Sequence, residues 1–238
     1  MDLSEWSKLN RDLRFLYTKK KFFNEFCYSL TYNLHGARCL INCKTADKLP
    51  TTVKSFNFRN TDRFVRYKNQ NASLKTLEDF YKYYTTPTDV KVKFRIGHYS
   101  FTVFADSESY LYNVANEILS EHKTRLSSVS LLEFDSDKKL LDQGFIITKK
   151  ESDHPYKVRL KEGFIKLEDR HALVNYIKNL DGEIKISKFI LERLSDRYKY
   201  FQGGFIYLND IKMLDILKML SPSLIGSVNQ TIINQKNQ

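Results

Sequence analysis

Residues 90–105 read VKVKFRIGHYSFTVFA, and this stretch predicts a β-hairpin. Over residues 90–96 apolar and basic side chains alternate strictly, which is the period of a strand with one buried and one exposed face. Gly97 and His98 provide a turn, and residues 99–105 continue as a second strand. The stretch therefore predicts an antiparallel pair that buries one side and carries positive charge on the other.

An amphipathic helix is expected directly after this hairpin, with Asp106 at the capping position. The apolar residues that follow recur with the spacing i, i+3, i+4, i+7 and form one stripe: Leu111, Val114, Ala115 and Ile118. Such a helix packs its stripe on a sheet. The sequence thus predicts an α+β fold of small mixed or antiparallel sheets covered by amphipathic helices.

The same order of elements returns near the C-terminus. Residues 204–208 form an apolar strand, Asn209 and Asp210 are a capping pair, and residues 211–220 have helical periodicity up to Pro222. This second run of strand, acidic cap and helix predicts an internal duplication of a βα module, as in split βαβ sheets.

The remaining segments are interpreted from periodicity and from helix and strand breakers. We expect helices over residues 3–20, 73–84, 168–180 and 187–194, two strands between residues 22 and 43 around a turn at His35 and Gly36, strands at 129–134, 145–148 and 156–160, a loop over the rest of 120–143, and a frayed polar tail at 229–238.

Residues 151–155, ESDHP, are interpreted as a linker. They divide the chain into a basic N-terminal α+β domain, residues 1–150, with a sub-boundary near residue 86, and a C-terminal α+β domain, residues 151–238.

The 238-residue chain carries a formal net charge of +11 at pH 7. Residues 1–70 hold 14 Lys and Arg against 6 Asp and Glu, whereas residues 71–150 balance at 11 against 11. Most of the excess therefore belongs to the first third of the chain. Positive charge of this size attracts nucleic acid or another polyanion.

Membrane and secreted classes do not fit the sequence. Charges interrupt every apolar run, so no segment reaches the roughly 20 apolar residues of a spanning helix. The first residues, MDLSEW, lack the basic start and apolar stretch of a secretion signal. Cys27, Cys39 and Cys43 are odd in number, which predicts free thiols in a reducing compartment. We therefore expect a cytoplasmic protein without a membrane partner.

Two predicted strands each project three cations from one face. These are Lys91, Lys93 and Arg95 in the first strand and Lys157, Arg159 and Lys161 in the second. If the strands are neighbours in one sheet, the cations form a surface for a polyanion, because like charges side by side otherwise destabilise the sheet. If the strands lie apart, these are solvated faces of the kind that guard strands against aggregation.

A second basic segment, residues 54–68, interleaves cations with aromatic residues. Its candidate nucleic-acid contacts are Lys54, Arg59, Arg63, Phe64, Arg66, Tyr67 and Lys68. Cations that hold phosphates and rings that stack on bases are how single strands are bound without strong sequence preference. The alternative interpretation is a hairpin that buries its aromatic residues and exposes its arginines.

Catalytic and cofactor patterns are weak. The five histidines show no HxH or HExxH spacing, and the Gly-rich run at residues 201–205 precedes a strand rather than opening a helix. A zinc site would have to combine the cysteines with His35. We therefore predict no cofactor, no metal and no catalytic residue.

The C-terminal run GFIYLND at residues 204–210, the helix after it and SPSLIG at residues 221–226 resemble the ending of uncharacterised proteins encoded by tailed phages of marine bacteria. The likeness covers the last third of the chain and, more loosely, the basic strand, aromatic hairpin and capped helix of the middle. The resemblance implies a viral origin, and hence the host-cell cytoplasm. It implies no activity and no site residue.

The leading hypothesis is therefore non-enzymatic binding of nucleic acid through residues 54–68 and the two cationic strands. The alternative is a virion component or host-directed protein whose basic surface meets an acidic protein. A metal-dependent nuclease built from distant carboxylates is the third hypothesis.

Overall fold

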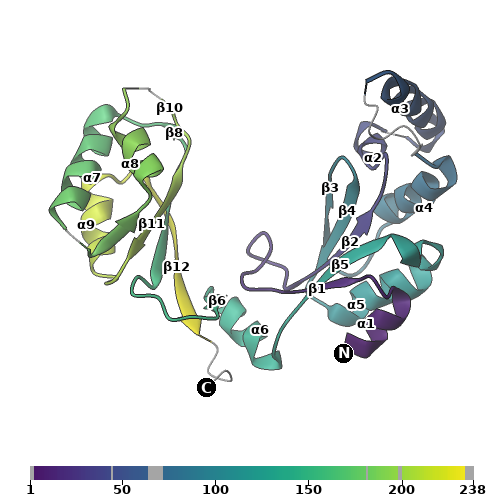
Figure 1. Cartoon of the computed structure of the whole chain (residues 1–238), viewed down its shortest axis with the longest axis horizontal. Coiled ribbons are helices and arrows are strands. Elements are labelled where there is room, and N and C mark those ends of the chain that lie inside the picture. The colour runs from purple at the N-terminus through teal and green to yellow at the C-terminus, as the bar shows by residue number, and fades with distance from the viewer. Residues whose placement is uncertain (1–2, 44, 64–71, 181, 198–199, 234–238) are drawn as a thin grey trace. The chain divides into compact units, whose positions relative to one another are not determined.

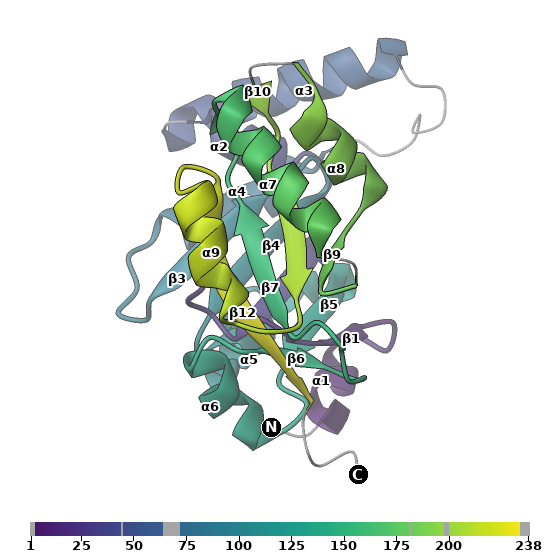
Figure 2. The ribbon, with the colours of Figure 1, turned by 90° about the vertical axis from the view of Figure 1, so that its left-hand side faces the viewer.

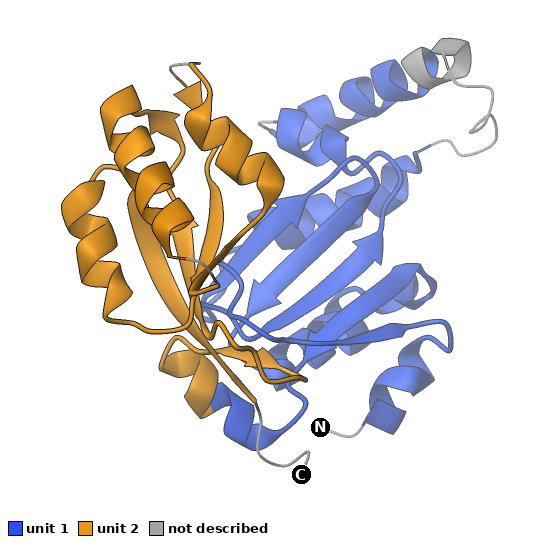
Figure 3. Ribbon diagram, turned by 60° about the vertical axis from the view of Figure 1, so that its left-hand side comes forward, with its two compact units in different colours: residues 1–138 blue, residues 139–238 orange. Residues whose placement is uncertain are grey.

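A computed structural model describes residues 3–43, 45–63, 72–180, 182–197 and 200–233, and of residues 59–63 it describes the backbone alone. The chain divides into unit 1, Met1–Lys138, and unit 2, Lys139–Gln238, which have different colours in Figure 3. This division comes before the expected linker at residues 151–155, because a strand that precedes the linker pairs within the sheet of unit 2.

Unit 1 is built on a five-stranded sheet (Figure 1). Its strands are β1 (Arg14–Tyr17), β2 (Tyr28–Asn33), β3 (Val92–Ile96), β4 (Ser100–Ala105) and β5 (Leu126–Leu131). They lie in the order β1-β5-β2-β4-β3, with β1 parallel to β5 and the other neighbours antiparallel. The pair β3 and β4 confirms the hairpin predicted from residues 90–105.

Helices cover one face of this sheet. The helices of unit 1 are α1 (Leu3–Leu9), α2 (Arg38–Asn42), α3 (Leu49–Arg63), α4 (Leu74–Thr85) and α5 (Glu108–Asn113), with short 3-10 turns η1 (Ala46–Lys48) and η4 (Ser120–Arg125). Phe80 of α4 and Leu111 of α5 are fully buried in one core with Tyr32 and Val103 of the sheet. The α4 prediction is confirmed, and Ser73 caps this helix by accepting a hydrogen bond from the Thr76 amide (3.4 Å).

The first predicted helix is shorter than expected. It ends at Leu9 instead of residue 20, because Asn10 makes a turn in which its Oδ1 accepts from the Asp12 amide (3.0 Å). The Asn10 amide group also donates to the carbonyl of Leu126 (2.7 Å), which fixes the turn beside β5. The chain then continues as β1, so pairing with a strand over one hundred residues away overrides the helical spacing.

The second of the two strands expected between residues 22 and 43 is a helix. β2 and the turn at Gly36 are present, but the chain then forms α2, whose Cys39 and Leu40 are buried in the core. Gly36 has φ 78°, and a Cβ there would lie 2.5 Å from the Cβ of Ala72. The sharp turn at this glycine directs the chain away from the sheet.

The helix after β4 starts and ends differently from the prediction. Ser107, not Asp106, is its cap: the Ser107 Oγ accepts from the Tyr110 amide (3.2 Å). α5 continues into a π-helical turn, η3 (Val114–Ile118), in which the Leu119 amide donates to the Val114 carbonyl (2.8 Å). The wider turn rotates Ile118 out of the predicted stripe, to 48% exposure, and buries Leu119.

The polar stretch 120–143 contains more regular structure than the loop we expected. The predicted weak strand is β5, and α6 (Asp135–Asp142) follows it. The carboxylate of Asp137 accepts a hydrogen bond from the Phe134 amide (3.1 Å) at the start of this helix.

Unit 2 is built on a second five-stranded sheet. Its strands are β6 (Ile146–Thr148), β7 (Tyr156–Leu160), β9 (Ile184–Ile186), β11 (Gly204–Leu208) and β12 (Ile225–Ile233), and a short pair, β8 (Gly163–Phe164) with β10 (Tyr200–Phe201), lies beyond the ends of β7 and β11. The order is β6-β12-β7-β11-β9, with β6 parallel to β12 and the other neighbours antiparallel.

The helices of unit 2 also lie on one face of their sheet, in front of β7 and β12 in Figure 2. They are α7 (Leu167–Asn179), α8 (Lys188–Ser195) and α9 (Met213–Leu220), close to their predicted ranges. Leu173 and Leu217 pack in one core with Val158 and Ile206 of the sheet. The frayed tail is a wrong prediction for residues 229–233, because they pair as β12 with β7 and β6; residues 234–238 lie outside the described residues.

The two sheets have the same topology, as expected for an internal duplication. If the strands of each unit are numbered along the chain, leaving out β8 and β10, both sheets have the order 1-5-2-4-3 and the same parallel pair, 1 with 5. In both units helices lie between strands 2 and 3 and between strands 4 and 5. Strands 2 to 5 thus form a split βαβ arrangement in each unit, and strand 1 is added beside strand 5.

Candidate nucleic-acid interface

The helix-free face of the unit 2 sheet combines aromatic rings with cations. Because side chains alternate along a strand, Phe205 and Tyr207 of β11 point away from the core that holds Ile206. In the sheet register Arg159 of β7 pairs with Phe205, and Lys157 pairs with Tyr207. Two aromatic residues and two cations therefore form a block on the two neighbouring strands β7 and β11.

The geometry of this block suits a planar anionic ligand. The Nζ of Lys157 lies 4.1 Å from the ring centroid of Phe205 and 5.6 Å from that of Tyr207. Phe205 is 42% exposed and Arg159 is exposed, so both side chains are accessible to solvent. Such cation–π contacts hold the ammonium group and the rings in place before a ligand arrives.

Neighbouring strands extend the same surface. Lys185 of β9 pairs with Tyr207, and Asn229 of β12 pairs with Lys157, so both lie on the same face. The five described strands of this sheet contain no Asp or Glu. Lys161, directly after β7, is exposed. The face therefore presents positive charge and aromatic rings without a carboxylate on its strands.

The two predicted cationic strands are not neighbours. β3, with Lys93 and Arg95, is an edge strand of the unit 1 sheet, whereas β7 lies inside the unit 2 sheet. The hypothesis that all six cations share one sheet is therefore wrong. The predicted alternation is present in each strand. In β3 the exposed Lys93 and Arg95 alternate with half-buried apolar residues, and in β7 the exposed Arg159 lies between the buried Val158 and Leu160.

The cations of β3 have contacts within unit 1. Lys91, just before β3, forms an ion pair with Glu25. The Nζ of Lys93 lies 4.0 Å from the ring centroid of Phe23, and the guanidinium of Arg95 lies 5.4 Å from that of Phe104. Segment 22–25 thus contacts Lys91 and Lys93, although all three cations remain exposed.

The basic segment 54–68 is helical as far as the structure describes it. α3 runs to Arg63, so the alternative interpretation as a hairpin is wrong. Lys54 is exposed, and Phe58 is 72% exposed. The side chains of Arg59 and Arg63, and all of Phe64, Arg66, Tyr67 and Lys68, lie outside the described residues.

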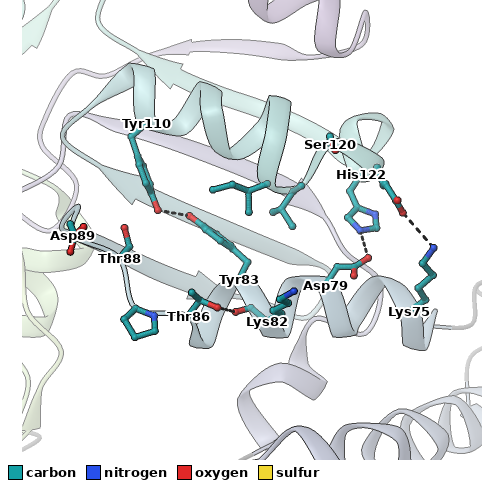
Figure 4. Close-up of a pocket in the computed structure, with 14 residues that line it drawn as sticks. Lys75, Asp79, Lys82, Tyr83, Thr86, Thr88, Asp89, Tyr110, Ser120 and His122 are labelled. Atoms are coloured by element: carbon teal, nitrogen blue, oxygen red, sulfur yellow. Dashed lines mark hydrogen bonds and ion pairs between the residues drawn. The ribbon is translucent and has the colours of Figure 1, made fainter.

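Unit 1 also contains a cavity of about 730 Å³ on its helical side, shown in Figure 4. His122, which is buried, has its Nε2 2.9 Å from the Oδ2 of Asp79 in the cavity wall. The hydroxyl groups of Tyr83 and Tyr110 lie 3.2 Å apart, and burial raises the pKa of Tyr83. A carboxylate that orients an imidazole is part of many catalytic triads. In the described part of the chain, however, no hydroxyl or thiol nucleophile hydrogen-bonds to His122, so we assign no catalysis to this cavity.

The cysteines are buried free thiols, as predicted. Burial and a hydrogen bond with Asp106 raise the pKa of Cys27 to about 12, and burial raises the pKa of Cys39 to about 11. Within the described ranges, no three His, Cys, Asp or Glu side chains come together in a way that could hold a metal ion.

Among the helices that the structure describes, none is both long and apolar enough to span a bilayer.

Sequence reasoning identified Lys157, Arg159 and Lys161 but missed Phe205 and Tyr207. Both alternate with Ile206 and Leu208 in an apolar strand, and this alternation was the feature of the sequence that could have identified them as residues of the exposed face. Comparisons of this chain with protein-family models, with curated proteins and with solved structures give no match.

Proposed function

We propose that this protein binds single-stranded nucleic acid on the helix-free face of the unit 2 sheet. The observation that carries the proposal is the block of Phe205 and Tyr207 opposite Arg159 and Lys157, on a sheet whose strands contain no carboxylate. An open sheet whose aromatic residues stack two or three bases is how RNA-recognition motifs hold RNA. Stacked aromatic residues in a basic groove bind single strands of either type.

The binding is proposed to be direct and non-enzymatic. Lys157, Arg159 and Lys185 would contact backbone phosphates, while the rings of Phe205 and Tyr207 stack on bases. A single strand fits better than a duplex, because base faces are accessible only when bases are unstacked from their neighbours. The resemblance of the last third of the chain to phage proteins supports a viral origin and action in the host-cell cytoplasm as part of the same proposal.

The test is fluorescence anisotropy with labelled single-stranded and double-stranded DNA and RNA at low salt. Each stacked base contributes about 1 to 3 kcal/mol to binding, which corresponds to about 5- to 150-fold in affinity. We therefore expect the double variant F205A/Y207A to bind single strands more weakly by about this factor for each base that loses its ring. The matched control is F189A, which removes a ring that is 60% exposed on α8 of the same unit. Equal binding by F205A/Y207A and the wild-type protein contradicts the proposal.

The main competing outcome is an acidic protein partner. A polyglutamate competitor separates the two, because it offers charge without bases. Two results together would show that the face recognises acidic protein, and the nucleic-acid proposal would then fail. The first is that polyglutamate displaces single-stranded DNA at equal charge concentration. The second is that F205A/Y207A binds polyglutamate as weakly as it binds DNA.

A further inference from the structure

Unit 1 has a position equivalent to the aromatic block of unit 2. Val103 of β4 pairs with Leu30 of β2, as Ile206 of β11 pairs with Val158 of β7. The next residue along strand 4 is Phe104 in unit 1 and Tyr207 in unit 2. On strand 3, Lys93 pairs with Phe104 and Lys185 pairs with Tyr207. The duplication thus places an aromatic ring beside a lysine on the helix-free face of both sheets.

The two faces differ in what covers the ring. Phe104 is only 1% exposed, because the rings of Phe22 and Phe23 lie on it at centroid distances of 5.1 and 5.0 Å. The Nζ of Lys93 lies over the Phe23 ring, 4.0 Å from its centroid. The Phe23 ring meets the Phe104 ring edge to face, at an interplanar angle of 89°. Phe104 is thus covered by side chains of its own unit, whereas its equivalent in unit 2, Tyr207, is partly exposed.

The segment that provides this ring has a strained backbone. Phe23 and Asn24 have φ of 56° and 60°, so both occupy the left-handed region. They form the tip of a tight turn in which the Glu25 amide donates to the Phe22 carbonyl (3.0 Å), and Phe22 and Phe26 pair across it. A left-handed conformation is unfavourable for a bulky side chain such as Phe and is retained only where surrounding contacts compensate.

The same turn also engages the positive charge of this face. Glu25 pairs with Lys91, Phe23 contacts Lys93, and Arg95 lies over the covered ring of Phe104. Like their counterparts in unit 2, the five described strands of this sheet carry no Asp or Glu. Displacing the turn would therefore uncover the ring of Phe104 and free Lys91 and Lys93, which are already exposed, from their contacts with the turn.

We propose that the helix-free face of the unit 1 sheet is a second site for single-stranded nucleic acid, masked by segment 22–25. The ring of Phe23 covers the ring of Phe104, on which a base would stack, and the carboxylate of Glu25 pairs with Lys91, as a phosphate would. The ligand class rests on the function proposed for unit 2, whereas the mask itself rests on the contacts within unit 1.

Two glycine substitutions separate the ring from the backbone. F23G removes the ring and places glycine where φ is positive, which relieves the backbone strain. N24G relieves the same kind of strain one residue later but keeps the ring, so it is the matched control. F22A/F23G removes both rings from Phe104 and is the stronger variant, provided that thermal unfolding shows a folded unit 1.

Binding is measured in the F205A/Y207A background, in which the unit 2 face has lost its rings. We expect F22A/F23G in this background to raise the affinity for a labelled single strand by about tenfold or more over the background alone. This is the gain expected when one base can stack on the uncovered ring. F23G should recover part of this gain, and N24G none.

If F22A/F23G does not fold, F23G alone decides. Suppose that F205A/Y207A weakens binding relative to the wild-type protein, and that adding F23G or F22A/F23G gives a folded protein with no higher affinity. This result overturns the masked site but leaves the unit 2 site intact. An equal gain from N24G also overturns it, because relief of strain alone would then explain the effect. If F205A/Y207A binds like the wild-type protein, the function proposed for unit 2 fails on its own.

Discussion

The salt dependence of binding provides a quantitative test of the unit 2 face. The change is the triple variant K157A/R159A/K185A, which removes the cations that the strands of this sheet place beside Phe205 and Tyr207. For single strands, log Kobs falls with log salt concentration with a slope of about −0.7 per phosphate neutralised. If each cation neutralises one phosphate, three cations contribute about −2 to the slope. When salt rises from 50 to 200 mM, these three cations should therefore account for a roughly 20-fold decrease in the affinity of the wild-type protein.

The assay is a set of anisotropy titrations at five or more salt concentrations in that range. We expect the slope of the triple variant to be shallower than that of the wild-type protein by about 2. The control, K178A/K188A/K218A, removes three exposed lysines from α7, α8 and α9 and so has the same net charge. If both variants flatten the slope equally, or neither does, the sheet face does not hold the phosphates and the reasoning is refuted.

The remaining predictions concern unit 1. Gly36→Ala should destabilise the protein by more than about 1 kcal/mol in urea unfolding, because φ is positive there and the new Cβ would lie 2.5 Å from that of Ala72; an unchanged midpoint would show that the turn adjusts freely. Cys27 and Cys39, whose pKa values are raised to about 12 and 11, should react slowly with a thiol reagent at pH 8 until denaturant is added. These thiols ionise near pH 9 in the unfolded chain, below their pKa values in the folded protein. Their contribution to the free energy of unfolding should therefore decrease as pH rises from about 9 to about 12, and a lower melting temperature at pH 10.5 than at pH 8 checks this direction.

Local elements with a clear period were predictable. The alternation in residues 92–96 and the turn at Gly97 depend on nearest neighbours along the chain, and the structure confirms them as β3 and β4. α4 and α7 were also predictable, because each has an apolar stripe and a terminating signal within a few residues.

Elements that depend on distant partners were missed. β1 has no strong strand period, and it is a strand because β5 offers a parallel edge for pairing. β12 includes polar residues such as Asn229 and Gln230, yet it lies between β6 and β7, where its backbone groups find partners on both sides. Backbone hydrogen bonds of this kind do not depend on side-chain type, so composition does not reveal them.

The candidate site was partly predictable for the same reason. Alternation identifies the cations of β7 from the sequence, because charge on every second residue is a local property. Phe205 and Tyr207 become part of a site only through their register with Arg159 and Lys157, almost fifty residues earlier in the chain. Equally, nothing local in residues 22–25 indicates that Phe23 lies on Phe104.

By itself the sequence determined the fold class, the charge, the two-sided nature of the cationic strands and the repeated βα order, because each of these follows from periodicity and composition over short windows. The tertiary structure alone decided which strands are neighbours. It separated β3 from β7, gave both sheets one topology, left Tyr207 partly exposed in unit 2 and covered its equivalent, Phe104, in unit 1. The physical reason is that strand pairing and ring packing join residues distant in the chain, and their free energies depend on the whole fold rather than on local preference.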